Sequence, residues 1–440
     1  MKAILLDGSY ENDETAERIR AALTSQLLCM GWQVDHILLR ERKIGNCAGD
    51  FFCWIRTPGL CNVNDENRDI AEAVIASDLM VYLTPVTFGG YSSALKSMVD
   101  HQIQNISPFF AQVSGETHHQ KRYRKYPDFL AIGWMEQADE QAEAVFRQLA
   151  ARNALNFYAH RSVSEVFLAG QSDAVLATSI ETLLNNLKTR RTSKINIPEM
   201  PREANPILET ATLRRALLLV GSPRTRKSSS QSLGGYLFDQ LSARAIQTET
   251  IYLHTVLRSP EKMQSLLDSV AVADLVLLAF PLYVDSLPAP VIEVLERIAA
   301  SRAEHAQNGR QLFAALANCG FPEAHHNATA LAICETFARQ TGFQWAGALA
   351  LGAGEGLVHG DPLQDARGPA IPIKKALEMA AEKLALGQPI PQAAMTLLAK
   401  SFIPGWMYRL IGILGWNQQA KIYNAEKSLK RQPYPRKTTL

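Results

Sequence analysis

The stretch Ala216–Ser232, ALLLVGSPRTRKSSSQS, joins a short apolar run to a loop that is rich in hydroxyl and basic side chains. The apolar run predicts a buried strand that ends at Gly221, and the residues after Ser232 continue with the periodicity of a helix. Backbone N–H groups at a helix N-terminus attract negative charge, so a strand, a polar loop and a helix start form a cradle for an anion. The side chains expected to hold this anion are Ser222, Arg224, Ser228, Ser230 and Ser232.

The same loop lacks the patterns of the common nucleotide sites. It has no Walker lysine motif, and no G-x-G-x-x-G follows the strand, which excludes the ATP-type and the NAD-type site. Serine hydroxyls and an arginine instead suit a monophosphate. The competing interpretation is a solvated loop, but this loop directly follows a strand, where α/β folds bind their ligands.

Composition places the chain among globular proteins of two or three domains. Its 440 residues carry a formal net charge of +2 and no long basic run before the tail, which argues against a nucleic-acid partner. The N-terminus enters a strand at Lys2–Leu6 without a signal peptide, and no clean apolar run reaches the roughly 18 residues of a membrane-spanning helix. We therefore expect a cytoplasmic protein.

Strands and helices alternate five times in each half of the chain, which is typical of a parallel, doubly wound sheet. The strands expected in the first half are Ala3–Leu6, Val34–Leu39, Leu79–Leu83, Phe129–Trp134 and Val163–Leu168. Those expected in the second half are Leu213–Val220, Thr248–Leu253, Leu275–Phe280, Leu312–Asn318 and Gln344–Leu351. The repeated order predicts a tandem duplication, with domains over 1–190 and 213–390, a proline-bearing linker over 191–212 and a helical tail over 391–440.

In such a sheet the loops after the first, third and fourth strands converge on one ligand. Two loops of the second half could wall a planar ring with apolar side chains and backbone groups: Pro281, Leu282, Tyr283, Val284 and Asp285, then Asn318, Cys319, Gly320 and Phe321. Gly352–Gly356 would line the rim. The alternative for Tyr283 and Phe321 is a place in the hydrophobic core.

The first half offers a weaker anion site. Its first loop, Gly8–Glu14, begins with Gly-Ser but has three carboxylates and no arginine, so we expect it to repel a phosphate. A second charged stretch, Gly115–Tyr126, is an anion-binding lid, a contact to a cofactor phosphate or a solvated loop, and the solvated loop is slightly favoured.

Three cysteines, Cys47, Cys53 and Cys61, cluster in one loop of the first half. Thiolates are soft ligands for a metal or an iron–sulfur cluster, and Asp50 is the candidate for the fourth ligand by position. The spacing matches no common zinc pattern. The alternative, which is favoured, is that the cysteines are packing residues or redox-active thiols.

Both halves resemble the NADPH-dependent FMN reductase family of flavodoxin-like proteins. Gly221–Arg224 with Ser228 and Ser230 is similar to the family's phosphate loop, and Phe280–Tyr283 to its isoalloxazine loop. The first half resembles the branch that includes iron–sulfur flavoproteins, but Asp50 stands where that branch usually has a further cysteine, which argues against a cluster.

The resemblance implies two tandem five-stranded flavodoxin-like sheets with FMN on the second. It implies an NAD(P)H-dependent oxidoreductase that passes electrons through FMN to a small, quinone-like acceptor. No side chain need act as an acid or base, so no catalytic residue is named. The alternative is a flavin-binding electron carrier, or a regulatory or scaffold module, without its own NAD(P)H turnover.

Two further expectations concern partners. Family members often pair as dimers, so the tandem chain could form an internal pseudo-dimer or a homo-oligomer. The aromatic stretch Phe402–Tyr408 and the basic run Lys421–Lys437 could contact a membrane surface. The favoured alternative for this tail is a helical pair that packs over the protein body.

Overall fold

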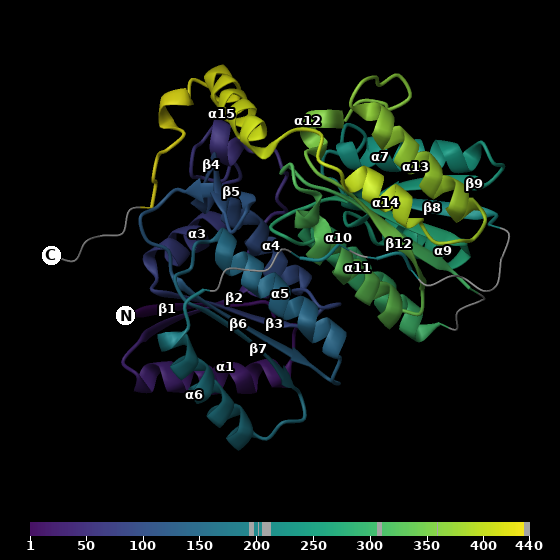
Figure 1. The fold of residues 1–440 in the computed structure, drawn as a ribbon. Helices are drawn as coiled ribbons and strands as arrows, with labels where there is room; N and C mark the ends of the chain where they lie inside the picture. Colours follow the sequence, from purple (N-terminus) through teal and green to yellow (C-terminus); the bar gives the residue numbers. More distant parts are fainter. Residues whose placement is uncertain (193–197, 201, 205–212, 306–309, 359, 435–440) are drawn as a thin grey trace. The chain divides into compact units, whose positions relative to one another are not determined.

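The computed structural model describes the chain except residues 193–197, 201, 205–212, 306–309, 359 and 435–440 (Figure 1). Most of the predicted linker, 191–212, lies outside the described residues. The chain divides into two compact units. The first comprises residues 1–196 and 406–440, and the second comprises residues 197–405.

The first unit contains a five-stranded parallel sheet in the order β2-β1-β3-β6-β7. Its strands are β1 (Lys2–Asp7), β2 (Gln33–Leu38), β3 (Leu79–Pro85), β6 (Asp128–Met135) and β7 (Ser162–Leu168). The central strands β1, β3 and β6 are almost continuously buried, because helices cover both faces of a parallel sheet. The edge strand β2 has no fully buried residue, which agrees with its mixed polar and apolar sequence.

Helices flank this sheet on both sides (Figure 1). The helices α1 (Glu14–Cys29) and α6 (Asp173–Thr189) pack against each other on one face and close a core with β1, β3, β6 and β7. The other face carries α3 (Asn67–Ala76), α4 (Ser93–His101) and α5 (Glu140–Asn156). Each helix therefore covers the sheet with one apolar face, as the sequence periodicity predicts.

The second unit repeats this architecture with the order β9-β8-β10-β11-β12. Its strands are β8 (Arg215–Val220), β9 (Gln247–Tyr252), β10 (Leu275–Pro281), β11 (Leu312–Asn318) and β12 (Gln344–Leu351). One face carries α7 (Ser229–Ser242), α13 (Ala370–Ala385) and α14 (Gln392–Ala399), and the other carries α9 (Pro260–Val272), α10 (Ala289–Glu304) and α11 (Ala328–Gln340). Both sheets have the 2-1-3-4-5 strand order of flavodoxin-like proteins, which confirms the predicted fold class.

The charged stretch Gly115–Tyr126 is not a solvated loop, so the favoured prediction is wrong. It contains the second strand, β5 (Glu116–Lys121), of an antiparallel hairpin whose first strand is β4 (Ile106–Val113). The Glu116 carboxylate is buried and bonded to two partners: His118 Nε2 at 2.8 Å and the buried Arg152 Nη1 at 2.9 Å. These buried charges neutralise one another, which is why a polar sequence can form a covered strand.

The C-terminal stretch does not form one tail. The helix α14 packs against α13 and β12 of the second unit, whereas α15 (Gly405–Ile422) belongs to the first unit. Beyond α15 the chain lies against the hairpin, where Arg122 Nη1 donates to the carbonyls of Leu429 at 3.1 Å and Arg431 at 2.7 Å. Among the described helices, none is long and apolar enough to cross a membrane.

The outer face of α15 is nevertheless apolar. Trp406, Leu410 and Leu414 recur every four residues and are 60%, 55% and 70% exposed. Another side of the helix contacts the hairpin, where the ring centres of Tyr408 and Phe110 lie 5.3 Å apart. Contact of this helix with a membrane surface stays a prediction.

Candidate functional site

The loops after β8, β10 and β11 leave the same edge of the second sheet. Gly221 N donates to Ala279 O at 2.8 Å, and Leu282 N donates to Asn318 O at 2.8 Å. These backbone hydrogen bonds join the carboxyl ends of the three strands. A methyl group on Gly221 would lie 2.6 Å from Val291 Cγ2, which leaves no room for a side chain. The structure therefore brings together the three loops that the sequence predicts to converge.

Two of the predicted serines place buried hydroxyl groups at this edge of the second sheet. Ser222 and Ser230 are 4% and 1% exposed. Asn318 Nδ2 donates to Ser230 Oγ at 2.9 Å and also to Phe280 O at 3.1 Å. This amide fixes the Ser230 side chain as an acceptor, so the Ser230 hydroxyl proton remains available for a further acceptor.

The other two predicted serines bond within the helix start. Ser228 caps α7, because its Oγ accepts from Gln231 N at 3.2 Å and donates to Thr225 O at 2.7 Å. Ser232 Oγ donates back to Ser228 O at 3.2 Å. Helix geometry gives the amides at the start of α7 no intrahelical acceptor, and the Ser228 cap takes up only that of Gln231. The first-turn amides of α7 are thus the groups that can still meet an anion.

Arg224 has an acidic partner that the sequence pattern does not indicate. Its Nη1 lies 2.5 Å from Glu355 Oε1, in the short helix α12 (Gly354–Val358) that follows β12. Ser229 Oγ donates to Gly354 O at 3.4 Å, which joins the same segment to the start of α7. The predicted rim residues Gly352–Gly356 therefore lie beside the anion loop, and one of them competes for its arginine.

The loop after β10 forms a tight two-residue turn. Tyr283 N donates to Ser286 O at 2.9 Å, and Ser286 N donates to Tyr283 O at 3.1 Å. The two residues between them have left-handed backbone, with φ of 46° at Val284 and 58° at Asp285. Left-handed backbone at a β-branched valine costs about 1–3 kcal/mol, and such strain clusters at ligand sites.

The loop after β11 is held by its cysteine. Cys319 is 4% exposed, and its sulfur contacts Phe321 O at 3.4 Å and Leu351 O at 3.7 Å. Burial raises the pKa of the Cys319 thiol to about 12, so this group stays protonated near neutral pH. The Phe321 ring packs against the buried His326, with ring centres 4.7 Å apart and the planes tilted by 42°, and a methyl group on Gly320 would meet nothing within 4 Å. Cys319 therefore shapes the loop and offers no thiolate.

The first unit has the same turn but different loop chemistry. Phe88 and Gly89 have φ of 54° and 84°, and the flanking residues exchange the same two backbone hydrogen bonds. At the start of α1, however, the cap is a carboxylate: Asp13 accepts from Ala16 N at 2.9 Å and from Trp134 Nε1 at 3.0 Å. A negative charge thus occupies the position where α7 has the Ser228 hydroxyl.

A second carboxylate is buried beneath this loop. Burial alone would raise the pKa of Asp7, but hydrogen bonds from His36, Ser9 and Arg20 lower it to about 2. The Arg20 Nη1 donor lies 2.9 Å from Asp7 Oδ2, and the buried carboxylate is fully ionised at neutral pH. The first unit therefore has the Asp13 carboxylate where the second has the Ser228 hydroxyl, whereas its buried Ser9, at the position of Ser222, accepts from Arg40 Nη1 at 2.7 Å.

The predicted cysteine loop does not fit a metal centre. Asp50, at the place of a fourth cysteine, accepts from Phe52 N at 3.0 Å, and Cys61 Sγ lies 3.5 Å from His101 Nδ1. Burial raises the pKa of the Cys47 thiol to about 12, and it also raises the pKa of the Cys53 thiol well above its usual value. Within the part of the chain that the structure describes, no three donor atoms of this loop lie within 4.8 Å of one another, as a mononuclear metal would require. We assign neither a metal nor a cluster to these residues.

Comparisons with known proteins match both halves to one family. The family described as NADPH-dependent FMN reductase matches residues 1–157 and, a second time, residues 214–342. The iron–sulfur flavoprotein of Methanosarcina thermophila is 24% identical over 103 residues, which cover 23% of this chain and 53% of that protein. The iron–sulfur flavoprotein of Archaeoglobus fulgidus is also 24% identical over 103 residues, which cover 23% of this chain and 46% of that protein. The chain thus spans about half the length of these two curated relatives.

Among solved structures, the chain is similar to the NAD(P)H:quinone oxidoreductase from Methanothermobacter marburgensis. The two are 17% identical with a TM-score of 0.29, over 40% of this chain and 98% of that chain.

Proposed function

Since the chain belongs to the NADPH-dependent FMN reductase family, we propose that it is an NAD(P)H-dependent flavin oxidoreductase that holds FMN at the anion loop of its second unit. The observation that carries the proposal is the pair of buried hydroxyls, Ser222 and Ser230, beside the start of α7. Hydroxyls and helix-start amides are the donors that a phosphate monoester needs. The donor set of this loop therefore fits the FMN phosphate.

The chain's own residues divide the work of binding. Ser222 and Ser230 donate hydroxyl protons to the phosphate, while Ser228 and Ser232 hold the helix start in shape. Arg224 neutralises phosphate charge when it leaves Glu355. The turn Pro281–Asp285 and the loop Asn318–Phe321 supply the wall and edge contacts for the flavin ring.

When bound, FMN supplies hydride acceptance from a nicotinamide nucleotide and electron transfer to a small acceptor, which we propose to be quinone-like. The protein's contribution is position and electrostatics. The Cys319 thiol is protonated and engaged by carbonyls, so it offers no nucleophile. The fixed carboxylates of Asp7 and Asp13 disfavour a second flavin phosphate in the first unit.

The test is the visible spectrum of the purified full chain, with release and quantification of the chromophore. We expect one FMN per chain and NAD(P)H oxidation with a quinone. Two FMN per chain would contradict the charge argument for the first unit. Bound flavin without NAD(P)H turnover would favour an electron carrier, and a colourless protein that rejects added FMN would overturn the proposal.

The binding residues are tested with matched serines. Ser230→Ala removes a buried hydroxyl group of the anion loop, whereas the control Ser242→Ala removes an exposed hydroxyl group at the far end of α7. We expect only Ser230→Ala to weaken FMN binding, by about tenfold, since a hydrogen bond to a charged group contributes about 1.5 kcal/mol or more. Equal affinities for both variants would remove Ser230 from the site.

A further inference from the structure

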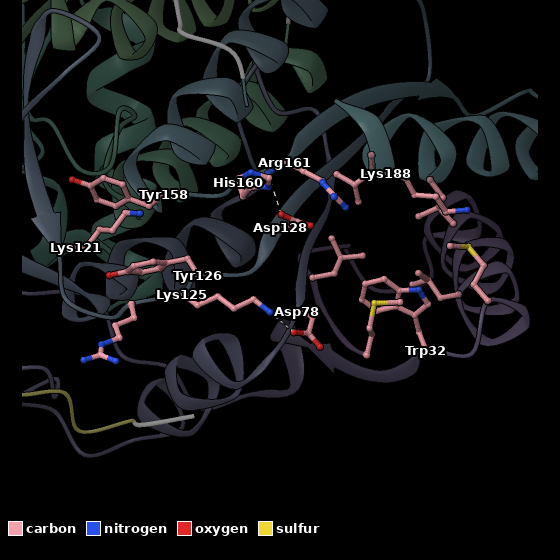
Figure 2. Close-up of a pocket in the computed structure, with 17 residues that line it drawn as sticks. Trp32, Asp78, Lys121, Lys125, Tyr126, Asp128, Tyr158, His160, Arg161 and Lys188 are labelled. Carbon is pink, nitrogen blue, oxygen red and sulfur yellow. Dashed lines mark hydrogen bonds and ion pairs between the residues drawn. The ribbon is translucent and has the colours of Figure 1, made fainter. Parts of the chain in front are cut away.

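A cavity of about 700 Å³ lies in the first unit at the amino-terminal edge of its sheet (Figure 2). Leu79 and Asp128 begin β3 and β6, and Arg161 directly precedes β7. Flavodoxin-like sheets bind their cofactors at the opposite, carboxyl-terminal edge. This cavity, which we call the basal pocket, is therefore separate from the flavin loops.

One wall of the basal pocket is apolar. Leu27 and Met30 come from the end of α1, and Leu184 and Leu187 come from α6. Trp32, in the connection to β2, completes this wall and packs against the hydrophobic core of the first unit. The volume of the basal pocket and its apolar wall are those of a site that can hold a drug-sized organic molecule.

The other side of the pocket is cationic. Its basic residues are Lys121, Arg124, Lys125, His160, Arg161 and Lys188. Two aspartates also line the pocket: Asp78 pairs with Lys125 at 2.9 Å, and Asp128 accepts from the Arg161 amide at 3.0 Å. Five Lys or Arg side chains against two carboxylates leave a surplus of positive charge, which favours an anion.

Aromatic rings flank the cationic side. Lys121 Nζ lies 5.0 Å from the centre of the Tyr158 ring, and Tyr126 lies 6.0 Å from Tyr158. Figure 2 shows Lys121, Tyr126 and Tyr158 on the side of the pocket away from Trp32. Charge and aromatic surface are thus presented together, across the cavity from the apolar wall.

From these observations we propose that the basal pocket binds an amphipathic organic anion. Its carboxylate or phosphate head lies near Arg161 and Lys188, and its apolar body lies against Trp32 and the leucines of α6. Surface lysines alone would attract any anion, but the apolar wall selects an anion with a hydrophobic body. The inference is independent of the flavin site, because every lining residue belongs to the first unit.

The experiment is a calorimetric titration of the full chain with decanoate, below its micelle concentration. Acetate has the same head without the body, and decyltrimethylammonium has the same body with the opposite charge. We expect saturable binding of decanoate at one site and at least tenfold weaker binding of the other two. Equal binding of acetate would contradict the role of the apolar wall in selecting the ligand, and equal binding of the cation would contradict the role of the positive charge.

Variants locate the binding site. Arg161→Gln with Lys188→Gln removes two positive charges from the pocket, and Lys375→Gln removes one from the exposed face of α13 in the second unit. We expect the double variant to bind decanoate at least tenfold more weakly and Lys375→Gln to bind it normally. Lys188→Gln alone removes one exposed positive charge from the pocket, and we expect about threefold weaker binding.

The flavin content and thermal unfolding of each variant report whether it is folded. Decanoate binding that is unchanged in the folded double variant, or absent in the parent chain, would overturn the proposal. If the double variant does not fold, the single variant Lys188→Gln decides, because unchanged binding in that variant would also overturn the proposal.

Discussion

The Arg224–Glu355 pair makes a sharp prediction about FMN affinity. The two side chains are 34% and 54% exposed and lie 2.5 Å apart, beside the loop proposed to hold the phosphate. The carboxylate occupies the arginine that a phosphate would use. We expect Glu355→Gln to tighten FMN binding, since it removes this competitor and its negative charge while it keeps the size of the side chain.

The magnitude follows from two terms. The solvent-exposed pair of Arg224 and Glu355 stabilises the FMN-free protein by up to about 1 kcal/mol. In the parent chain FMN binding must break this pair, and in Glu355→Gln it need not. Repulsion between a carboxylate and a phosphate dianion several ångströms apart adds about 1 kcal/mol at a water-like dielectric constant. A total of about 1–2 kcal/mol corresponds to roughly 5- to 30-fold tighter binding.

The assay is quenching of flavin fluorescence on deflavinated protein, with riboflavin as the control ligand because it lacks the phosphate. We expect Glu355→Gln to tighten FMN and leave riboflavin unchanged, and Arg224→Gln to weaken FMN about tenfold. In an Arg224→Gln background the benefit of Glu355→Gln should shrink to the repulsion term alone. Weaker FMN binding by Glu355→Gln, or an equal change for both flavins, would refute the competition and show that the pair only holds the loop in place.

Three other predictions concern the first unit. The pKa of Asp7 is lowered from 3.8 to about 2, so its ionised form stabilises the fold above about pH 4, and this contribution is lost as the pH falls through 2. In chemical unfolding, Asp7→Asn should therefore lower the free energy of unfolding by about 2 kcal/mol at pH 7 and progressively less toward pH 2. Gly8→Ala would place a methyl group 2.5 Å from a leucine Cβ and should lower stability by about 1–3 kcal/mol, whereas the control Gly170→Ala, with open space around it, should be nearly neutral in thermal unfolding. Iodoacetamide at pH 7.5 should modify the exposed Cys29 in the native protein and leave the buried Cys53 until urea is added, because burial raises the pKa of the Cys53 thiol well above its usual value. Mass spectrometry that finds Cys53 modified as fast as Cys29 would contradict this burial.

The sequence predicts the sheets well because their strands are long apolar runs with polar ends. The bounds of β11 and β12 match the prediction to the residue, at Leu312–Asn318 and Gln344–Leu351. Parallel strands covered on both faces leave little choice of side-chain pattern, so hydrophobicity alone locates them. The duplication is equally visible, since the same order of elements returns after the proline-bearing segment.

Local polarity misleads where charges compensate over a distance. The hairpin strand β5 contains Glu116 and His118, and a pattern of alternating apolar residues cannot reveal that Arg152 of α5 pairs with the Glu116 carboxylate, which also bonds to His118. The Arg224–Glu355 pair joins residues 131 positions apart, so the sequence offers a cradle arginine but not its competitor. Propensity also argues against left-handed backbone at Val284, and only the fold of the turn imposes it.

The two units show how one fold can carry two different sites. Both have the same strand order and the same two-residue turn after the third strand, which the cores determine. The cap of the first helix differs: it is the Asp13 carboxylate in one unit and the Ser228 hydroxyl in the other. We expect the fixed charge of Asp13 to disfavour a phosphate at the start of α1, whereas the neutral Ser228 hydroxyl leaves the first-turn amides of α7 able to bind one. On this hypothesis the fold supplies the helix N-terminus twice, and the capping side chain determines which copy suits an anionic cofactor.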